Sequence, residues 1–188
     1  MGFLDAILGR SKPVRPDLDQ LFALPSAAVT LQAAAGFAPT GLGSVCFASV
    51  EGGAFSRIQE EARALLDGPV EFSQDAYGYT WLLVRHAATE DVAGLVNDLH
   101  AVNTSLAEAG FGPQLLCSLI GFRDEQDRTL ALVYLYKRGT FYPFVPRPGG
   151  GEKRDNPVEL QVRAMLGDDL TIERDLARWF PVWGAPGL

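Results

Sequence analysis

Two long apolar runs near the middle of the chain predict its central strands. They cover residues 115–122 and 130–136, and six polar residues between them suit a hairpin loop. Side chains on both faces of both runs are largely apolar, whereas a hairpin with one face in water alternates apolar and polar residues. We therefore expect a sheet that is covered on both faces.

Shorter patterns before the hairpin predict two helices and four further strands. Apolar stripes at helical spacing cover residues 54–66 and 90–109, and Gly68 and Gly110 supply the stops. The expected strands are residues 27–34, 43–50, 70–73 and 77–86. The link 36–43 is rich in Gly and Pro and suits a turn between the first two.

After the hairpin, residues 140–144 can add a short edge strand, which Pro143 and Pro146 would end. Such an edge could accept a strand from a partner. Asn156 can cap a helix that runs to Leu166, and a last helical turn is expected around Trp179.

The resulting order is β-β-α-β-β-α-β-β-α-α, which predicts an α+β fold. Short links between successive strands imply a mainly antiparallel sheet with helices packed on it. At 188 residues the chain fits a single domain, which we place at residues 21–188 with a Trp-rich C-terminal tail. We expect residues 1–20 to form an N-terminal amphipathic helix and a linker that contains prolines.

The N-terminal helix has one apolar stripe, made of Phe3, Leu4, Ile7 and Leu8. This stripe either packs on the domain or on a partner chain, or it contacts a membrane surface, as short amphipathic helices do. Both interpretations stay open at this point.

Composition and charge narrow the class of protein. Hydrophobic residues make up 47% of the chain and charged residues 21%, as in ordinary globular domains. The net charge of −7 argues against a nucleic-acid partner. No apolar run approaches the roughly 20 residues of a transmembrane helix, and the N-terminus lacks a signal-peptide pattern. We expect a cytoplasmic protein, and a peripheral position at the inner face of the membrane is kept as an alternative.

The two cysteines, Cys46 and Cys117, lie far apart in the sequence and within apolar runs. A free cysteine in such a run behaves as a small buried hydrophobic residue. We expect both to be free thiols rather than a disulfide.

No motif predicts a catalytic, metal or cofactor site. His86 and His100 are the only histidines, and neither has partners in the sequence that would complete a metal site or a nucleophile–histidine–acid triad. Adjacent helix positions do not face each other, which separates Asp98 from His100. The Gly-rich segments lack the dinucleotide and phosphate-loop patterns. We expect no enzymatic activity and no cofactor.

An acidic run near the C-terminus contains Asp168, Asp169, Glu173 and Asp175. It could bind a cation or act as an acid–base pair, but such runs are more often solvated turns. A small-ligand or enzyme domain that uses Asp168, Asp169 or His86 is therefore kept as an alternative.

Basic and aromatic residues alternate after the hairpin and predict a partner-binding surface. Its residues are Lys137, Arg138, Phe141, Tyr142, Arg147 and Arg154. Such a mixture suits an acidic partner helix, an anionic ligand or a phospholipid headgroup. In the alternative interpretation, the aromatic rings belong to the core and the cations are solvated. Trp179, Phe180 and Trp183 are likewise either a lid over the core or an exposed docking patch.

Stretches along nearly the whole chain resemble a known family. They are MGFLDAILGRSKP, LFALPSAAVTLQ, DAYGYTWLLV, DLHAVN, GFGPQLLCSLIGF, LVYLYKRGTFYPF, ELQVRAMLGDDL and RWFPVWGAPGL. They are similar to the PspAB family of PspA-associated proteins, found beside phage-shock protein A in bacterial envelope-stress gene clusters. The resemblance implies association with PspA, a coiled-coil protein that binds stressed membranes, and it brings no catalytic residue with it.

We therefore expect a non-catalytic cytoplasmic accessory protein of the phage-shock response that binds PspA or a related partner. A peripheral membrane-binding protein is the alternative from a different class.

The membrane alternative makes a direct prediction. Deleting residues 1–10 removes Phe3, Leu4, Ile7 and Leu8, so less protein should sediment with anionic vesicles. Equal sedimentation of the full-length and shortened chains would exclude this role for the segment.

Overall fold

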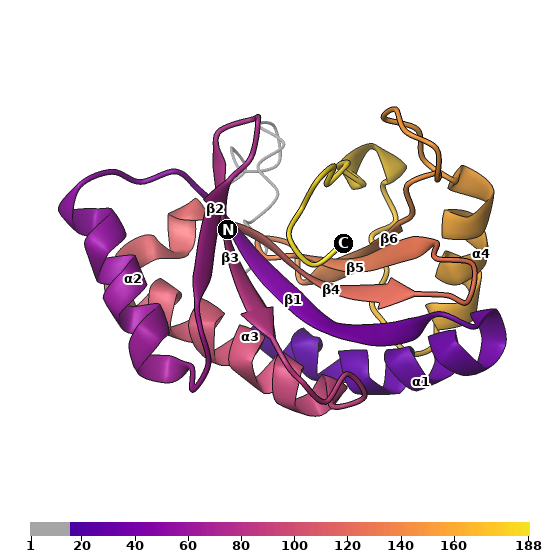
Figure 1. Cartoon of the computed structure of the whole chain (residues 1–188), viewed down its shortest axis with the longest axis horizontal. Coiled ribbons are helices and arrows are strands. Elements are labelled where there is room, and N and C mark those ends of the chain that lie inside the picture. The colour runs from indigo at the N-terminus through magenta and orange to yellow at the C-terminus, as the bar shows by residue number, and fades with distance from the viewer. Residues whose placement is uncertain (1–15) are drawn as a thin grey trace, which may run out of the picture.

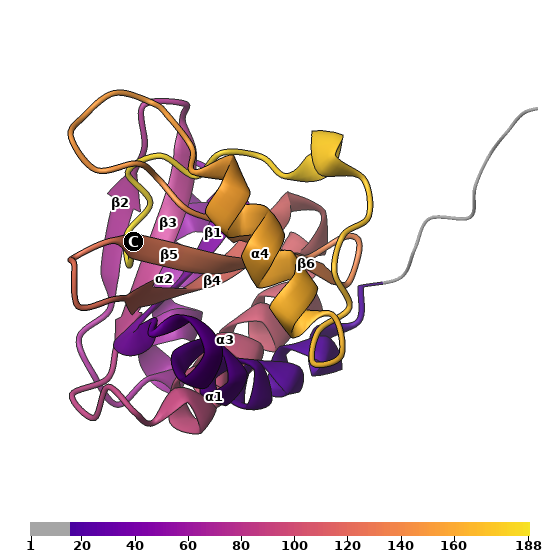
Figure 2. The ribbon, with the colours of Figure 1, turned by 90° about the vertical axis from the view of Figure 1, so that its right-hand side faces the viewer.

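A six-stranded antiparallel sheet forms the centre of the computed structural model, which describes residues 16–188 (Figure 1). The strand order is β2-β3-β1-β4-β5-β6. Helices α1, α2 and α3 cover one face, and the C-terminal tail, residues 167–188, covers part of the other. Figure 2 shows α4 beside the β6 end of the sheet, where it contacts β6 and α1.

The strands are β1 (Ala38–Ala48), β2 (Glu71–Gln74), β3 (Tyr79–Arg85), β4 (Leu115–Arg123), β5 (Thr129–Leu135) and β6 (Thr140–Phe144). The helices are α1 (Leu24–Ala35), α2 (Gly53–Leu65), α3 (Val92–Leu106) and α4 (Asn156–Leu166). The α+β class and the mainly antiparallel sheet are thus confirmed.

Alternating side chains of the sheet enter two separate cores, as the two-faced apolar runs predict. On β5, Leu130, Leu132 and Tyr134 face the helices. Ala131 and Val133 face the tail with Trp179 and Val182. Each buried apolar side chain contributes about 1.5–3 kcal/mol, so both covers add substantially to stability.

The predicted strand at residues 27–34 is wrong, because this segment belongs to helix α1. Val29 and Thr30 are typical of strands, but the surrounding alanines are the strongest helix formers. Leu24, Ala28 and Leu31 are buried at helical spacing. Gly36 then ends the helix in the left-handed conformation, with φ of 73°.

Three smaller differences concern element ends. The turn after residue 36 is short, and β1 already begins at Ala38. Asp155, rather than Asn156, caps α4 by accepting a hydrogen bond from the Val158 N–H at 3.3 Å. The last helical turn is a single 3-10 turn, Leu176–Arg178.

The expected edge strand is present as β6, and the chain itself covers its outer edge. The Phe141 N–H donates to the Thr171 carbonyl at 2.9 Å, and its carbonyl accepts from the Glu173 N–H at 2.7 Å. Pro143 has no N–H to offer. A partner strand could pair here only by displacing residues 171–173.

The predicted helix at residues 1–10, with Phe3, Leu4, Ile7 and Leu8, lies outside the described residues. The first described element is the 3-10 turn Leu18–Ala23, in which Leu21 is buried. Just before it, the Asp17 carbonyl accepts a hydrogen bond from the Tyr134 hydroxyl at 2.7 Å.

Close packing of the tail against β4 predicts the effect of one added methyl group. A Cβ atom at Gly121 would overlap the carbonyl oxygen of Gly187, so Gly121→Ala must displace the end of the tail. We expect a loss of about 1–3 kcal/mol in the free energy of unfolding, measured by urea denaturation, with faster proteolysis of the tail.

Gly53→Ala is the matched control, since no atom lies within 4 Å of the added methyl group. It should leave stability unchanged or slightly raised. Equal stability of the two variants would contradict the tail packing.

Candidate functional site

A cleft of about 1010 Å³ remains on the tail side of the sheet, where the tail does not cover it. Its floor includes Cys46, Trp81, Cys117 and Leu135 from four strands of the sheet. The tail contributes residues 180–183, and the turn between β2 and β3 lies at another side. The volume is at the upper end of the range for ligand pockets.

Exposed aromatic side chains line this cleft. Tyr77 is 60% exposed, Tyr79 44% and Phe180 57%. Large apolar side chains gathered around a hollow are typical of surfaces that bind another molecule. This is the property that distinguishes the cleft from the smaller hollow of about 750 Å³ between the start of β1 and the end of the tail.

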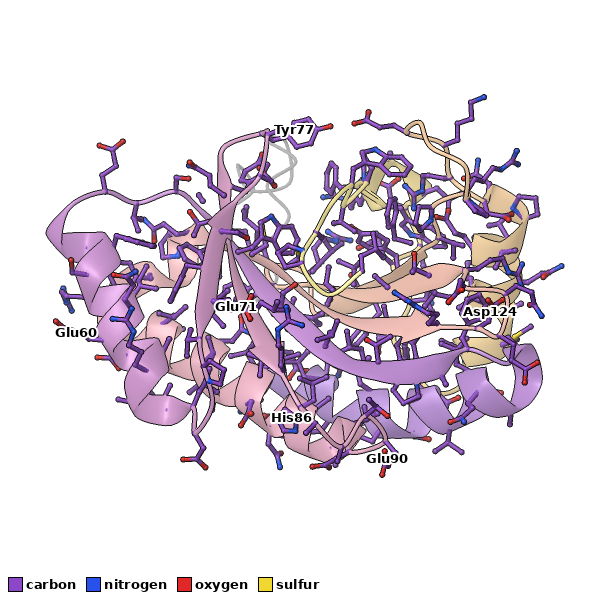
Figure 3. The ribbon with its side chains drawn as sticks, viewed as in Figure 1. Glu60, Glu71, Tyr77, His86, Glu90 and Asp124 are labelled. Atoms are coloured by element: carbon purple, nitrogen blue, oxygen red, sulfur yellow. The ribbon has the colours of Figure 1, made fainter. Side chains whose placement is uncertain are left out.

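Asp75 organises the β2–β3 turn beside the cleft. Its carboxylate accepts hydrogen bonds from the Trp81 Nε1–H and from the N–H groups of Tyr77 and Tyr79, each at 2.9 Å. Tyr77 reaches from this turn toward the loop before α4 (Figure 3), and its hydroxyl donates to Glu152 at 3.2 Å. That hydrogen bond raises the pKa of Tyr77. This exposed hydrogen bond therefore joins the two loops over the cleft.

Arg138 lines the cleft but is held by a buried carboxylate. Its Nε–H donates to Glu173 at 2.6 Å, and the Thr140 hydroxyl donates to the same carboxylate at 2.8 Å. Burial by itself would raise the pKa of Glu173, which is only 2% exposed. The hydrogen bonds from Arg138, the Asp175 N–H and Thr140 outweigh it, so the pKa lies below the usual range.

Arg154 joins three parts of the fold. Its Nε–H donates to Glu159 at 2.8 Å, another of its N–H groups donates to the Trp179 carbonyl, and its guanidinium lies 5.0 Å from the Phe144 ring centroid. Burial raises the pKa of Glu159, and the Arg154 pair and the Val145 N–H offset only part of that effect. Arg154 therefore has a structural role between α4, β6 and the tail.

The structure brings together three of the six predicted partner-binding residues. Lys137, Arg138 and Tyr142 line the cleft, whereas Arg147 is exposed on the loop before α4 and does not line it. Phe141 and Tyr142 are fully buried, so their rings belong to the core, as the alternative interpretation expects. Partner binding by the exposed cations stays a prediction.

The tail is a lid over the sheet. Trp179 stacks on Tyr142 with ring centroids 5.9 Å apart, and Trp183 meets the Phe144 ring edge-on at 4.8 Å. The Tyr142 hydroxyl donates to the Phe180 carbonyl at 2.7 Å. Only Phe180 of the three tail aromatics turns its ring outward.

The acidic run does not assemble into one site. Asp168 is exposed, Asp169 accepts from the Ser26 hydroxyl at 2.8 Å, and Asp175 caps the 3-10 turn. Its interpretation as a wholly solvated turn is wrong for Glu173, because Arg138 holds that carboxylate in the interior.

Both histidines pair with carboxylates away from the cleft. His86 Nε2 lies 2.7 Å from Asp98 Oδ2, and His100 Nε2 lies 3.1 Å from Asp19 Oδ1. The first pair joins the end of β3 to α3, which is why sequence spacing missed it. Among residues 16–188, no three histidine, cysteine or acidic side chains gather as a metal site would require.

Comparison with known proteins gives one match. The model of a family described as PspAB, PspA associated protein B, matches residues 1–187. The chain matches no curated protein and no solved structure. Within residues 16–188, every helix is too short or too polar to cross a membrane.

The Arg138–Glu173 pair predicts a dependence of stability on pH. The folded-state pKa of Glu173 lies below its unfolded value. The Glu173 carboxylate therefore contributes stability at pH values above the unfolded pKa, and this contribution is lost as the pH falls through the folded pKa.

Arg138→Met should lower the free energy of unfolding by about 1–3 kcal/mol at pH 7, because it leaves a buried carboxylate without its main partner. The loss between pH 5 and pH 3 should become smaller than in the wild type. Arg147→Met, at an exposed arginine on the loop before α4, should change neither quantity in urea denaturation. Identical pH profiles for Arg138→Met and the wild type would contradict this role of the pair.

Proposed function

Since the chain belongs to the PspAB family of PspA associated proteins, we propose that it is a non-catalytic accessory protein that binds PspA through the tail-side cleft. It acts in the cytoplasm, in the membrane stress response in which PspA takes part. The family name supports an accessory role linked to PspA. The cleft supplies the surface for that role.

The observation that carries the proposal is the group of exposed aromatic side chains around an apolar floor. Tyr77, Tyr79 and Phe180 each leave about half of the side chain in water, although all three border a hollow lined by Trp81 and Leu135. Aromatic residues in such positions are enriched among those that contribute most to binding energy.

An amphipathic helix is the partner element that fits this surface. A coiled-coil protein, which the resemblance implies for PspA, carries one apolar stripe with charged residues on both sides. The stripe would lie on the aromatic rings and the floor of the cleft, as in other helix-in-groove complexes. Its acidic flank would meet Lys137 and Arg178, and its basic flank Glu152, since all three line the cleft.

Polar side chains at the cleft are already hydrogen-bonded within the fold, which supports binding rather than catalysis. The Asp75 carboxylate accepts three hydrogen bonds from its own turn and from β3, and Arg138 is paired with Glu173. Neither histidine lines the cleft. A general acid or base has to reach the reacting atom within hydrogen-bond distance, and these groups are instead engaged within the fold.

Aromatic truncation tests the proposed surface. Tyr79→Ala and Phe180→Ala should each weaken the complex with purified PspA about tenfold or more, because each removes a ring that the partner would bury. The dissociation constants are measured by isothermal titration calorimetry.

Leu160→Ala is the matched control, since Leu160 is 45% exposed on α4 and does not line the cleft. It should bind as the wild type does. No binding by the folded wild type would overturn the proposed function, and equal affinities of all three variants would exclude the cleft as the binding surface.

Reversing the charge of Lys137 tests whether this exposed cation contributes to the complex with PspA. Lys137→Glu should weaken binding and flatten its dependence on salt, whereas Arg163→Glu on the exposed side of α4 should do neither. Arg138 is unsuited to this test, because reversing its charge would also repel the buried Glu173 carboxylate.

A further inference from the structure

Two thiols lie side by side in the floor of the cleft. The pairing of β1 with β4 places Cys46 directly opposite Cys117, with both side chains on the same face of the sheet. Both side chains belong to the tail-side core, and both line the cleft. Seventy-one positions of sequence separate them, so only the register of the sheet reveals the pair.

Residues directly opposite each other on antiparallel strands lie close to the separation that a disulfide requires. Directly opposite residues of an antiparallel pair have Cβ atoms about 4.5–5.5 Å apart, and a disulfide needs about 3.5–4.5 Å. The strands must therefore approach by roughly 1 Å at this point. A register shift between Cys46 and Phe47 interrupts the ladder next to the pair, and such irregularities let a strand bend locally.

From this arrangement we propose that Cys46 and Cys117 are a reversible disulfide-forming pair that small disulfides oxidise through the cleft. The pair is a modification site of the folded protein. A small disulfide such as oxidised glutathione is the probe that the cleft can admit.

Cys117 is the thiol that reacts first. It is 8% exposed, against 3% for Cys46. The neighbouring Cys117 side chain and burial both raise the pKa of the Cys46 thiol above its ordinary value, which disfavours the Cys46 thiolate.

Disulfide formation by thiol–disulfide exchange takes two steps. The Cys117 thiol loses its proton, and its sulfur attacks one sulfur of the small disulfide, whose S–S bond breaks and releases one thiolate. Cys46 then loses its proton and attacks the Cys117 sulfur, which breaks the mixed disulfide and releases the second thiolate. Protein dithiol and one small disulfide thus give a protein disulfide and two small thiols.

Closing the bond also changes the cleft. Cys46 is paired with Trp81 of β3, and Cys117 with Leu135 of β5, so drawing the two cysteines together shifts the floor on both sides. We expect oxidised protein to bind PspA with a different affinity from reduced protein. This second effect rests on the proposed function, whereas disulfide formation does not.

The test treats the folded, full-length wild type with oxidised glutathione, without any partner. Intact mass after acid quenching should show the loss of two hydrogen atoms in a monomer, and dithiothreitol should reverse it. Wild type that keeps two free thiols while urea-unfolded protein oxidises would overturn the proposal. Oxidation only between separate chains would overturn it as well.

Single alanine variants test the order of attack. Cys46→Ala should accumulate glutathione on Cys117, because the second thiol that resolves the mixed disulfide is missing. Cys117→Ala should remain largely unmodified under the same conditions, since only the less accessible Cys46 is left. Equal modification of both would contradict the assigned order, and the wild-type result stands even if a variant fails to fold. A titration of PspA against reduced and oxidised wild type then tests the second effect separately.

Discussion

A sheet that buries apolar side chains on both faces needs two covers, and this requirement shapes the whole molecule. The helices supply one cover with regular backbone hydrogen bonds. The other is the C-terminal tail, whose only helical part is the 3-10 turn Leu176–Arg178. Irregular backbone in contact with a core has to find partners for its polar groups. Arg154 and Tyr142 supply them by donating to the carbonyls of Trp179 and Phe180. The tail therefore stays on the sheet through a few specific contacts as well as through its tryptophans.

The same requirement explains why cations of the predicted surface are partly structural. Glu173 and Glu159 are buried where the tail and α4 meet β6, and a buried carboxylate is costly unless it is paired and hydrogen-bonded. Arg138 and Arg154 meet this need. The two carboxylates differ in pKa, which is lowered from its usual value for Glu173 and raised for Glu159. Two of the four basic residues of the predicted surface are thus committed to the fold, and Lys137 is the one of the other two that lines the cleft of the proposed complex.

The tail also connects stability with the proposed function. It covers only part of the sheet, and the uncovered part is the cleft with its aromatic rim and its pair of thiols. Phe180 follows directly on Trp179, so one short segment completes the core and forms a wall of the candidate site. A partner that binds there would contact a segment held by side-chain contacts rather than by a strand ladder. Such a segment can respond to binding at lower cost than a paired strand could.

Local patterns in the sequence determined much of the architecture, because helical spacing, two-faced apolar runs and Gly stops act within a few residues. Helices α2 and α3, the β4–β5 hairpin and β6 follow from them. The strand prediction for residues 27–34 was wrong because Val29 and Thr30 are typical of strands. In the structure this segment is helical, and Leu24, Ala28 and Leu31 are buried where α1 packs against α3 and α4. Only the tertiary structure decided the cleft, the Arg138–Glu173 pair and the opposition of Cys46 and Cys117. Each of these joins segments far apart in the chain, and strand register and tail packing, which bring them together, are absent from any local pattern.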